Sequence, residues 1–172
     1  MRTNDDNIKN LSNSEAIEKL KKLSEDADFC FFVTELNTKP LNGRPMSTAD
    51  VDENGCIYFF SDRNSDKNQQ IEYDNTVQLF YSNKGSAEYL SVYGKAEIST
   101  DKELIEKLWN PMVKTWFQGG KDDPDITVIK VIPEDAYYWD TKHNKMVSLI
   151  KMLTSVITGK TMDDSVEGKL NP

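Results

Sequence analysis

Apolar residues recur along this chain with two different periods, which separate the expected helices from the expected strands. Ile17, Leu20 and Leu23 follow one another at helical intervals, and the preceding Ser12–Glu15 stretch has the spacing of a capping box. We therefore predict a helix from about residue 13. A second amphipathic helix is predicted near the C-terminus, from apolar residues at positions 146, 149, 150, 153 and 157.

Between these two helices the chain carries short β-rich runs separated by turn sequences. The runs read FCFFVTEL, RPMSTADV, CIYFFSD, TVQLFYSN, AEYLSVYGKAEIST, ITVIKVIP and AYYWD. The stretches NTKPLNG and DENG, and the turn at residues 84–86, are typical connections between antiparallel strands. This order predicts an antiparallel meander of six or seven strands that forms a small barrel with attached helices, in the α+β class.

Two shorter helices are expected within the β-rich region. Ser65 is in position to cap a helix that runs to about Tyr73, and Asp101 to cap a helix that Pro111 ends. The stretch PMVKTWFQGGKDDPD that follows is expected to be irregular. We predict one domain over residues 13–158, preceded by a flexible arm (1–12) and followed by a tail (159–172).

Composition restricts the classes of partner. The 172 residues include 21 Lys and Arg against 29 Asp and Glu, a net charge of −8 that disfavours nucleic acid and anionic membrane surfaces. The chain lacks an apolar leader and a run of 18 apolar residues, which predicts a cytoplasmic protein. Cys30, Cys56 and one histidine do not make a zinc-ligand set, and the thiols are expected to be buried and reduced.

Common catalytic motifs are absent from the sequence. It contains no GxGxxG, P-loop or GxSxG pattern. His143 stands between lysines in TKHNK, which favours a solvated side chain over a catalytic triad. Asp122 and Asp123 lie in a stretch bounded by Gly and Pro, where a solvated turn is the simpler interpretation. No catalytic residue is therefore assigned.

A polar strand, GRPMST at residues 43–48, is the feature that needs explanation. It holds Arg44, and Ser65 and Lys67 follow where the next strand runs into a predicted helix. A helix N-terminus with a nearby lysine binds phosphate, and a guanidinium can complete such a site. The alternative is that Arg44 and Lys67 pair with surface carboxylates, and the spacing leaves both interpretations open. The other residues of this anion-binding set are Ser47, Thr48, Ser61 and Arg63.

Energetics indicate that a phosphate group alone would not hold a ligand here. Three charge-assisted hydrogen bonds of roughly 1.5–3 kcal/mol each give about 5–9 kcal/mol before ordering costs, while micromolar binding needs about 8 kcal/mol net. The ligand should therefore also bury an apolar or aromatic body. Candidate walls, each of which could equally belong to the core, are Met46, Phe59, Phe60, Trp109, Trp116 and Phe117.

Four segments in order give the sequence a specific resemblance. They are GRPMST, then IYFFSDRNSDKNQQIEYDNTVQLFYSN, then EYLSVYGKAEISTD, then LWNPMVKTWFQGGKDDPDITVIKVIPEDAYYWD. Together they resemble the FMN-binding split-barrel superfamily of pyridoxamine 5'-phosphate oxidase, and most closely its general stress protein 26 group, over residues 16–160. The resemblance implies a homodimer of six-stranded antiparallel split barrels with peripheral helices, with one FMN in each of two clefts between subunits.

The resemblance also implies roles for individual residues. Arg44 would contact the FMN phosphate or ribityl chain, and the isoalloxazine would run along Pro45, Met46 and Ser47. Ser65 and Lys67 would complete the phosphate site. Phe60 and Ser61 would lead into that site at the end of their strand, while Trp116 and the strand around Ser91 would close the ring pocket from the second subunit.

Two departures from the superfamily pattern argue against pyridoxamine 5'-phosphate oxidase activity. Relatives with that activity carry Ser-Arg-Lys where this chain has Asp66 between Ser65 and Lys67. The stretch YYWDTKHNK also lacks their substrate-binding pair of arginine and histidine. The expectation is an FMN-binding oxidoreductase of unknown substrate, with a nicotinamide nucleotide as candidate electron donor. The alternatives are a flavin-binding or sensing protein without turnover, and a split barrel that uses another redox ligand such as a deazaflavin or haem.

Overall fold

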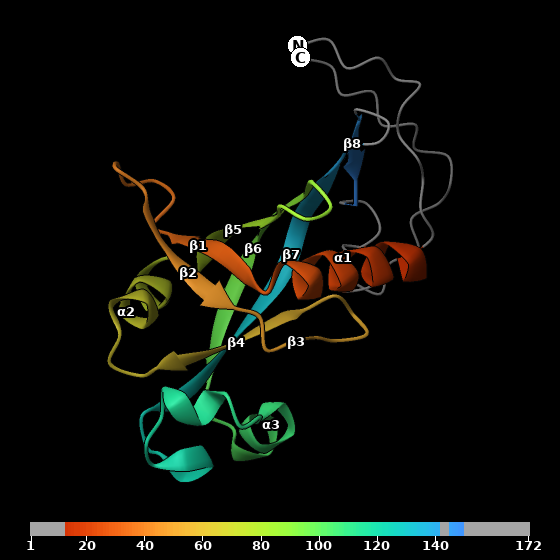
Figure 1. Cartoon of the computed structure of the whole chain (residues 1–172). Helices are drawn as coiled ribbons and strands as arrows, with labels where there is room; N and C mark the ends of the chain where they lie inside the picture. The colour runs from red at the N-terminus through yellow and green to blue at the C-terminus, as the bar shows by residue number, and fades with distance from the viewer. Residues whose placement is uncertain (1–12, 142–144, 150–172) are drawn as a thin grey trace.

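The computed structural model describes residues 13–141 and 145–149 (Figure 1). Its helices are α1 (Asn13–Ala27), α2 (Asp66–Tyr73) and α3 (Lys102–Leu108), with 3₁₀ turns η2 (Val113–Thr115) and η3 (Gly120–Asp122). Its strands are β1 (Phe29–Thr34), β2 (Asn42–Ser47), β3 (Asp50–Val51), β4 (Ile57–Asp62), β5 (Thr76–Asn83), β6 (Glu88–Ser99), β7 (Ile126–Asp140) and β8 (Lys145–Ser148).

The helices predicted before residue 111 are confirmed. In α1, Ala16, Leu20 and Leu23 form the buried stripe. Helix α2 ends at Tyr73 as predicted, and the Asp101 side chain caps α3 by accepting a hydrogen bond from the amide of Glu103. None of the helices in the described ranges has the length and apolar character needed to cross a membrane.

The strands form one antiparallel sheet in the order β2-β1-β5-β6-β7-β4-β3, with β8 added to β7. The long central strand β7 pairs with β4 over residues 126–131 and with β8 over residues 137–140, while β6 runs along its other side. The predicted α+β, mainly antiparallel split-barrel class is confirmed. The described residues form eight strands rather than six, because β3 and β8 are short additions. ITVIKVIP and AYYWD belong to a single strand, β7.

The predicted C-terminal helix is wrong over its first residues. Lys145–Ser148 form strand β8, antiparallel to Tyr137–Asp140. Strand β7 extends past the end of β4, so this edge carries unpaired backbone groups that a returning strand satisfies. Leu149 then bonds through its amide to the Ala136 carbonyl and is buried. The arm (1–12), His143, residues 150–158 and the tail (159–172) lie outside the described residues.

Two consecutive residues connect the ends of the sheet. The amide of Thr48 donates to the Asp28 carbonyl beside β1, at 3.4 Å, and the amide of Ala49 donates to the Tyr58 carbonyl in β4, at 2.7 Å. Because β1 and β4 lie toward opposite ends of the strand order, the step from β2 to β3 curves the sheet into a half-closed barrel.

Two apolar clusters fill the fold. The main core lies inside the sheet and under α1, and includes Phe32 and Phe59, whose rings meet edge to face at 5.2 Å. A second cluster joins β4 and β7 to α3 and η2, which Figure 1 shows at the end of the molecule opposite β8. The first half of β7 is therefore buried on both faces. Residues of the second cluster are Cys56, Tyr58, Ile105, Leu108, Val113, Phe117, Ile126 and Val128.

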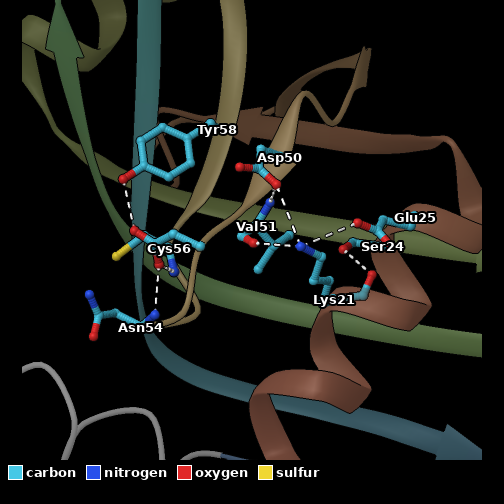
Figure 2. Close-up of polar contacts among 9 residues, drawn as sticks. Lys21, Ser24, Glu25, Asp50, Val51, Asn54, Cys56 and Tyr58 are labelled. Carbon is cyan, nitrogen blue, oxygen red and sulfur yellow. Dashed lines mark hydrogen bonds and ion pairs between the residues drawn. The ribbon is translucent and has the colours of Figure 1, made fainter. Parts of the chain in front are cut away.

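A polar clasp connects α1 to the β3–β4 hairpin (Figure 2). Lys21 donates to the Val51 carbonyl at 3.3 Å, and its ammonium lies 3.7 Å from both Asp50 and Glu25. Cys56 is buried beside this hairpin, and Cys30 is buried in the main core; both are free thiols, as expected for reduced interior cysteines. The clasp joins α1 to the β3–β4 hairpin.

Candidate functional site

The Arg44 guanidinium bridges β2 to two neutral oxygens. Nη1 donates to Thr34 Oγ1 at 2.7 Å and Nη2 donates to Gln70 Oε1 at 2.9 Å. The Thr34 hydroxyl in turn donates to Gln70 Oε1 at 2.6 Å, which closes a ring of three hydrogen bonds between β1, β2 and α2. Partial burial lowers the pKa of Arg44, while the Asp66 and Glu35 carboxylates act in the opposite direction. The guanidinium still carries its full charge at neutral pH, because arginine loses its proton only at far higher pH.

Lys67, in the first turn of α2, is the second cation of this site. Its pKa is lowered, first by partial burial and then by the neighbouring charge of Arg44. Within the described ranges, neither Arg44 nor Lys67 has a carboxylate oxygen within 4.0 Å. The ion-pair interpretation of these two residues is therefore not what the geometry shows. Two like charges that disfavour each other are stabilised by an anion between them.

Carboxylates nevertheless surround these cations at longer range. Asp66 acts on both Arg44 and Lys67, and Asp62 acts on Lys67. A hollow of about 280 Å³ lies beside α2 and is lined by Glu35, Asp66, Gln69, Gln70 and Tyr73. Because two carboxylates line it, this hollow does not suit an anion, and the candidate surface for one is the cationic side formed by Arg44 and Lys67.

A buried polar network fixes the start of α2. Ser61 Oγ donates to Asn68 Oδ1 at 2.6 Å, and Asn68 Nδ2 donates to Thr127 Oγ1 at 2.9 Å. Thr127 then donates to the Ser61 carbonyl at 2.9 Å. Ser65 stands at the N-cap position, but its hydroxyl donates to the Asp62 carbonyl at 2.7 Å instead of accepting from the helix. The amides of the first turn are therefore not occupied by a capping side chain.

Four of the predicted site residues converge at this place: Arg44, Ser61, Ser65 and Lys67. Ser61 is 3% exposed and its hydroxyl is used by Asn68, so it positions α2. Phe60 is half-buried and meets Trp109 edge to face at 6.2 Å in the second cluster. It thus lies on the other face of β4.

The remaining predicted residues occupy different surroundings. Pro45 and Ser47 are exposed on β2, whereas the Met46 side chain is 8% exposed and belongs to the main core. Trp116 is 80% exposed after η2. Ser91 is buried on β6 and accepts a hydrogen bond from Gln78 Nε2 at 2.8 Å. Within one chain, Ser91 and Trp116 are not brought to the Arg44 cluster.

Ser91 belongs instead to an aromatic surface on the outside of the sheet, which no other described element covers. The register places Phe31 opposite Phe80, Phe80 opposite Ser91, and Ser91 opposite Tyr137, in one row across four strands. The Phe31 ring also covers Gly43, where a Cβ atom would stand 2.1 Å from the ring. We call this surface the outward face; its residues are Phe29, Phe31, Gln78, Phe80, Tyr89, Ser91, Tyr93, Asp135 and Tyr137.

Several of these contacts were not predicted from the sequence. Gln70 lies three residues after Lys67 on α2, a spacing that places both on one side of the helix. Thr34 and Thr127 carry no such signal, because their partners, in α2 and in other strands, are distant in sequence. The Phe31 ring leaves no room for a side chain at position 43, and this contact becomes apparent only from the pairing of β1 with β2.

Comparisons with known proteins identify a family and two relatives of this chain. The family model for pyridoxamine 5'-phosphate oxidase-like proteins matches residues 15–163. Protein bli-3 of Neurospora crassa is 30% identical over 129 residues, which are 70% of this chain and 62% of the relative. The chain thus spans less than two thirds of bli-3. General stress protein 26 of Bacillus subtilis is 32% identical over 96 residues, 54% of this chain and 68% of the relative.

A solved structure shares the fold. The crystal structure of the general stress FMN/FAD binding protein from Xanthomonas citri matches with a TM-score of 0.63 and 21% sequence identity. The match covers 91% of this chain and 97% of that one. The split-barrel arrangement described above is therefore the arrangement of that protein as well.

Proposed function

This chain belongs to the pyridoxamine 5'-phosphate oxidase-like family, and on that premise we propose that it is a homodimeric FMN-binding protein of the general stress protein 26 type, acting as a cytoplasmic oxidoreductase. The observation that carries the proposal is the pair of cations Arg44 and Lys67, which has no carboxylate partner within 4.0 Å in the described ranges. The description of the Xanthomonas citri protein as FMN/FAD binding supports the choice of ligand.

The donor chemistry of the site fits the FMN phosphate. Arg44 keeps N–H groups beyond the two that bind Thr34 and Gln70, and Lys67 supplies an ammonium from the same side. The amides of the first turn of α2 add the partial positive charge of a helix N-terminus. Pro45 and Ser47, exposed next to Arg44 along β2, would lie along the rest of the flavin.

The outward face supports the homodimer. Phe29, Phe31, Phe80 and Tyr89 are each 46–57% exposed and Tyr137 is 38% exposed, so a second copy is the natural cover for them. In such a dimer Ser91 and Trp116 of one copy would complete the ring pocket of the other. The flavin supplies the electron transfer, and the residues of the chain hold and orient it.

The experiment is a visible absorption spectrum of the purified protein, followed by titration of the apo form with FMN and with riboflavin. We expect one FMN per chain and a much weaker affinity for riboflavin, which lacks the phosphate. Arg44→Ala should weaken FMN binding by about 1.5–3 kcal/mol, roughly ten- to 150-fold, and leave riboflavin binding nearly unchanged. Lys84→Ala is the control, because it removes an exposed positive charge from the turn between β5 and β6, outside the anion-binding set.

Two further readouts test the rest of the proposal. Trp116→Ala should change the fluorescence of bound FMN, while Met112→Ala, equally 80% exposed in the same region, should not. Bleaching of the flavin band by a nicotinamide nucleotide, with return in air, would support turnover. A flavin band that never bleaches indicates a binding protein instead, and a protein that takes up no FMN contradicts the proposal.

A further inference from the structure

The outward face carries almost no charge, although 29% of the residues of the chain are charged. Its nine residues are aromatic or polar, with Asp135 as the single ionisable carboxyl. Asp135 lies opposite Tyr93 at the bulge between β6 and β7. The nearest charged residues along these strands, Lys95 and Glu134, pair with each other at 3.3 Å.

The Asp135 carboxyl is incompletely satisfied. Its Oδ1 atom is buried and has no hydrogen-bond partner among the described residues. The carboxyl lines a hollow of about 130 Å³ together with Gln78, Phe80, Ser91, Tyr93 and Tyr137. Buried oxygens of this kind are rare in folded proteins and point to a missing donor or to a bound proton.

A second copy of the chain is the occupant that this face fits. Two copies of net charge −8 repel each other, so they associate best through a surface with little charge. Five aromatic side chains of 150–250 Å² are each about half exposed, so together they expose on the order of 500 Å² of surface. A standard interface buries about 800 Å² per partner, and these side chains would supply more than half of it.

Two-fold symmetry determines which groups Asp135 can meet there. In an isologous interface the same patch faces itself, so the partner presents the same nine residues. These residues offer amide, hydroxyl and phenol groups from Gln78, Ser91, Tyr89, Tyr93 and Tyr137, but no cation. Among the described residues, β5 contributes Gln78 and Phe80 to the surroundings of Asp135 and β6 contributes Ser91 and Tyr93. The nearest cation of these strands, Lys95, is paired with Glu134.

We propose that two copies of this chain associate through the outward face and that each copy carries Asp135 into the interface without a counter-charge, so that association takes up protons at Asp135. This inference rests on the homodimer of the proposed function and adds its interface and its regulation. Burial already raises the pKa of the Asp135 carboxyl in the single chain. Further burial raises it more, so the dimer binds a proton more tightly than the monomer does.

The test is sedimentation velocity of the full chain between pH 5.5 and 8, above the sequence pI of about 4.7. At pH values at which Asp135 is ionised in the monomer but protonated in the dimer, the dissociation constant should rise by up to tenfold per pH unit for each Asp135 carboxyl. Asp135→Asn should remove this dependence, and its dimer should be at least as tight as the wild type at pH 8. Glu134→Gln, the neighbouring control, should keep the dependence.

Each other result contradicts the proposal. Loss of charge repulsion near the pI would change the dissociation constants of the wild type and of Asp135→Asn equally. The same pH dependence in both proteins would therefore overturn the proposal. A dissociation constant that does not change with pH also overturns the proposal. One that falls as pH rises overturns it too, and indicates that the partner supplies a cation to Asp135. Phe80→Glu should abolish association; a dimer that survives this change uses another surface. A monomer at every pH would mean that another segment of the chain covers the face.

The same samples separate this inference from the flavin proposal. Absorbance near 450 nm reports bound FMN, and absorbance at 280 nm reports the mass of the sedimenting species. Flavin retained without proton-linked association overturns only the role of Asp135. Proton-linked association without any flavin overturns only the FMN proposal.

Discussion

Arg44 in β2 donates a hydrogen bond to Gln70 in α2 at 2.9 Å, and this contact links the polar strand to the helix that carries Lys67. Gln70 Oε1 also accepts from Thr34, so one amide oxygen orients two donors. The guanidinium is thus held in place by neutral groups that leave its charge available to a ligand.

Loss of this contact should weaken ligand binding without removing a charge. We expect Gln70→Ala to reduce FMN affinity by about 0.5–1.5 kcal/mol, because the guanidinium loses one of its two orienting oxygens. Fluorescence titration with FMN measures the effect. Gln69→Ala, an exposed neighbour on the same helix, is the control, and equal losses in both variants would show that Gln70 does not orient Arg44.

Asp66 reduces the positive potential of the site. Asp66→Asn should tighten FMN binding by about 0.2–1 kcal/mol, roughly 1.4- to fivefold, since the carboxylate acts on both Arg44 and Lys67 from an exposed position. Titrations at low and high salt provide the measurement, and the gain should shrink as salt rises. Glu72→Gln, also exposed on α2, removes the same charge as a control. A gain of the same size in Glu72→Gln would make the effect one of net charge alone.

Asn68 is the buried centre of the network that fixes the first turn of α2. Asn68→Ala should lower the free energy of unfolding by about 1–3 kcal/mol, because Ser61 and Thr127 each lose a partner inside the protein. Urea unfolding followed by circular dichroism measures this loss. Asn64→Ala, at an exposed position, should change stability by less than about 0.5 kcal/mol. A similarly small effect at Asn68 would contradict a structural role for the network.

Gly94 allows the close approach of β6 and β7 at the bulge. A Cβ atom at this position would stand 2.2 Å from the Ile132 carbonyl oxygen, which is backbone and cannot rotate away. Gly94→Ala should therefore cost about 1–3 kcal/mol of unfolding free energy, measured by thermal or urea unfolding. At Gly85 the nearest atom is a side-chain oxygen at 3.3 Å, so Gly85→Ala should be much milder.

The two thiols should resist alkylation in the folded protein. Burial raises the pKa of Cys30 to about 12 and that of Cys56 to about 11, so little thiolate is present at pH 8. Iodoacetamide labelling followed by mass spectrometry should be slow in buffer and fast in urea, with Cys56 reacting before Cys30 as pH rises. Rapid labelling of either cysteine in buffer at pH 8 would contradict this.

The same pKa values set a pH dependence of stability. Both folded values lie above the roughly 8.5 of an unfolded thiol. Their contribution to the unfolding free energy is therefore complete below about pH 8.5 and is lost as pH rises toward 11–12. Replacement of both cysteines by serine should remove this part of the alkaline loss.

Local patterns predicted most of the elements but not their lengths or their ends. The helical spacing of Ile17, Leu20 and Leu23 and the cap at Asp101 depend on neighbours within a few residues, so the sequence reveals them. In the fully buried stripe the structure has Ala16 in place of Ile17, which is partly buried. Strand β7 looked like two strands because Pro133 interrupts the apolar run, yet the bulge at Tyr93 and Gly94 accommodates that proline. The apolar stripe that includes Met146 and Leu149 predicts a helix, but pairing with β7 makes Lys145–Ser148 a strand, and Leu149 follows it.

The candidate site was predictable where it depends on charge and spacing. Arg44, Ser65 and Lys67 are predicted as site residues because cations and hydroxyls are unexpected in such a strand and helix start. Thr34 and Gln70 were not found, since they hold Arg44 from elements 10 and 26 residues away. Asp135 was not found either, because an acidic residue carries no signal in a chain with 29 of them.

The step from β2 to β3 makes the closure of the barrel and the placement of Arg44 inseparable. Thr48 and Ala49 connect the two ends of the sheet only four and five residues after Arg44. Side chains alternate along a strand, so lengthening or shortening this stretch by one residue would turn position 44 to the opposite side of β2. Surface loops generally tolerate insertions and deletions. The length of this connection is fixed both by the closure of the barrel and by the orientation of Arg44.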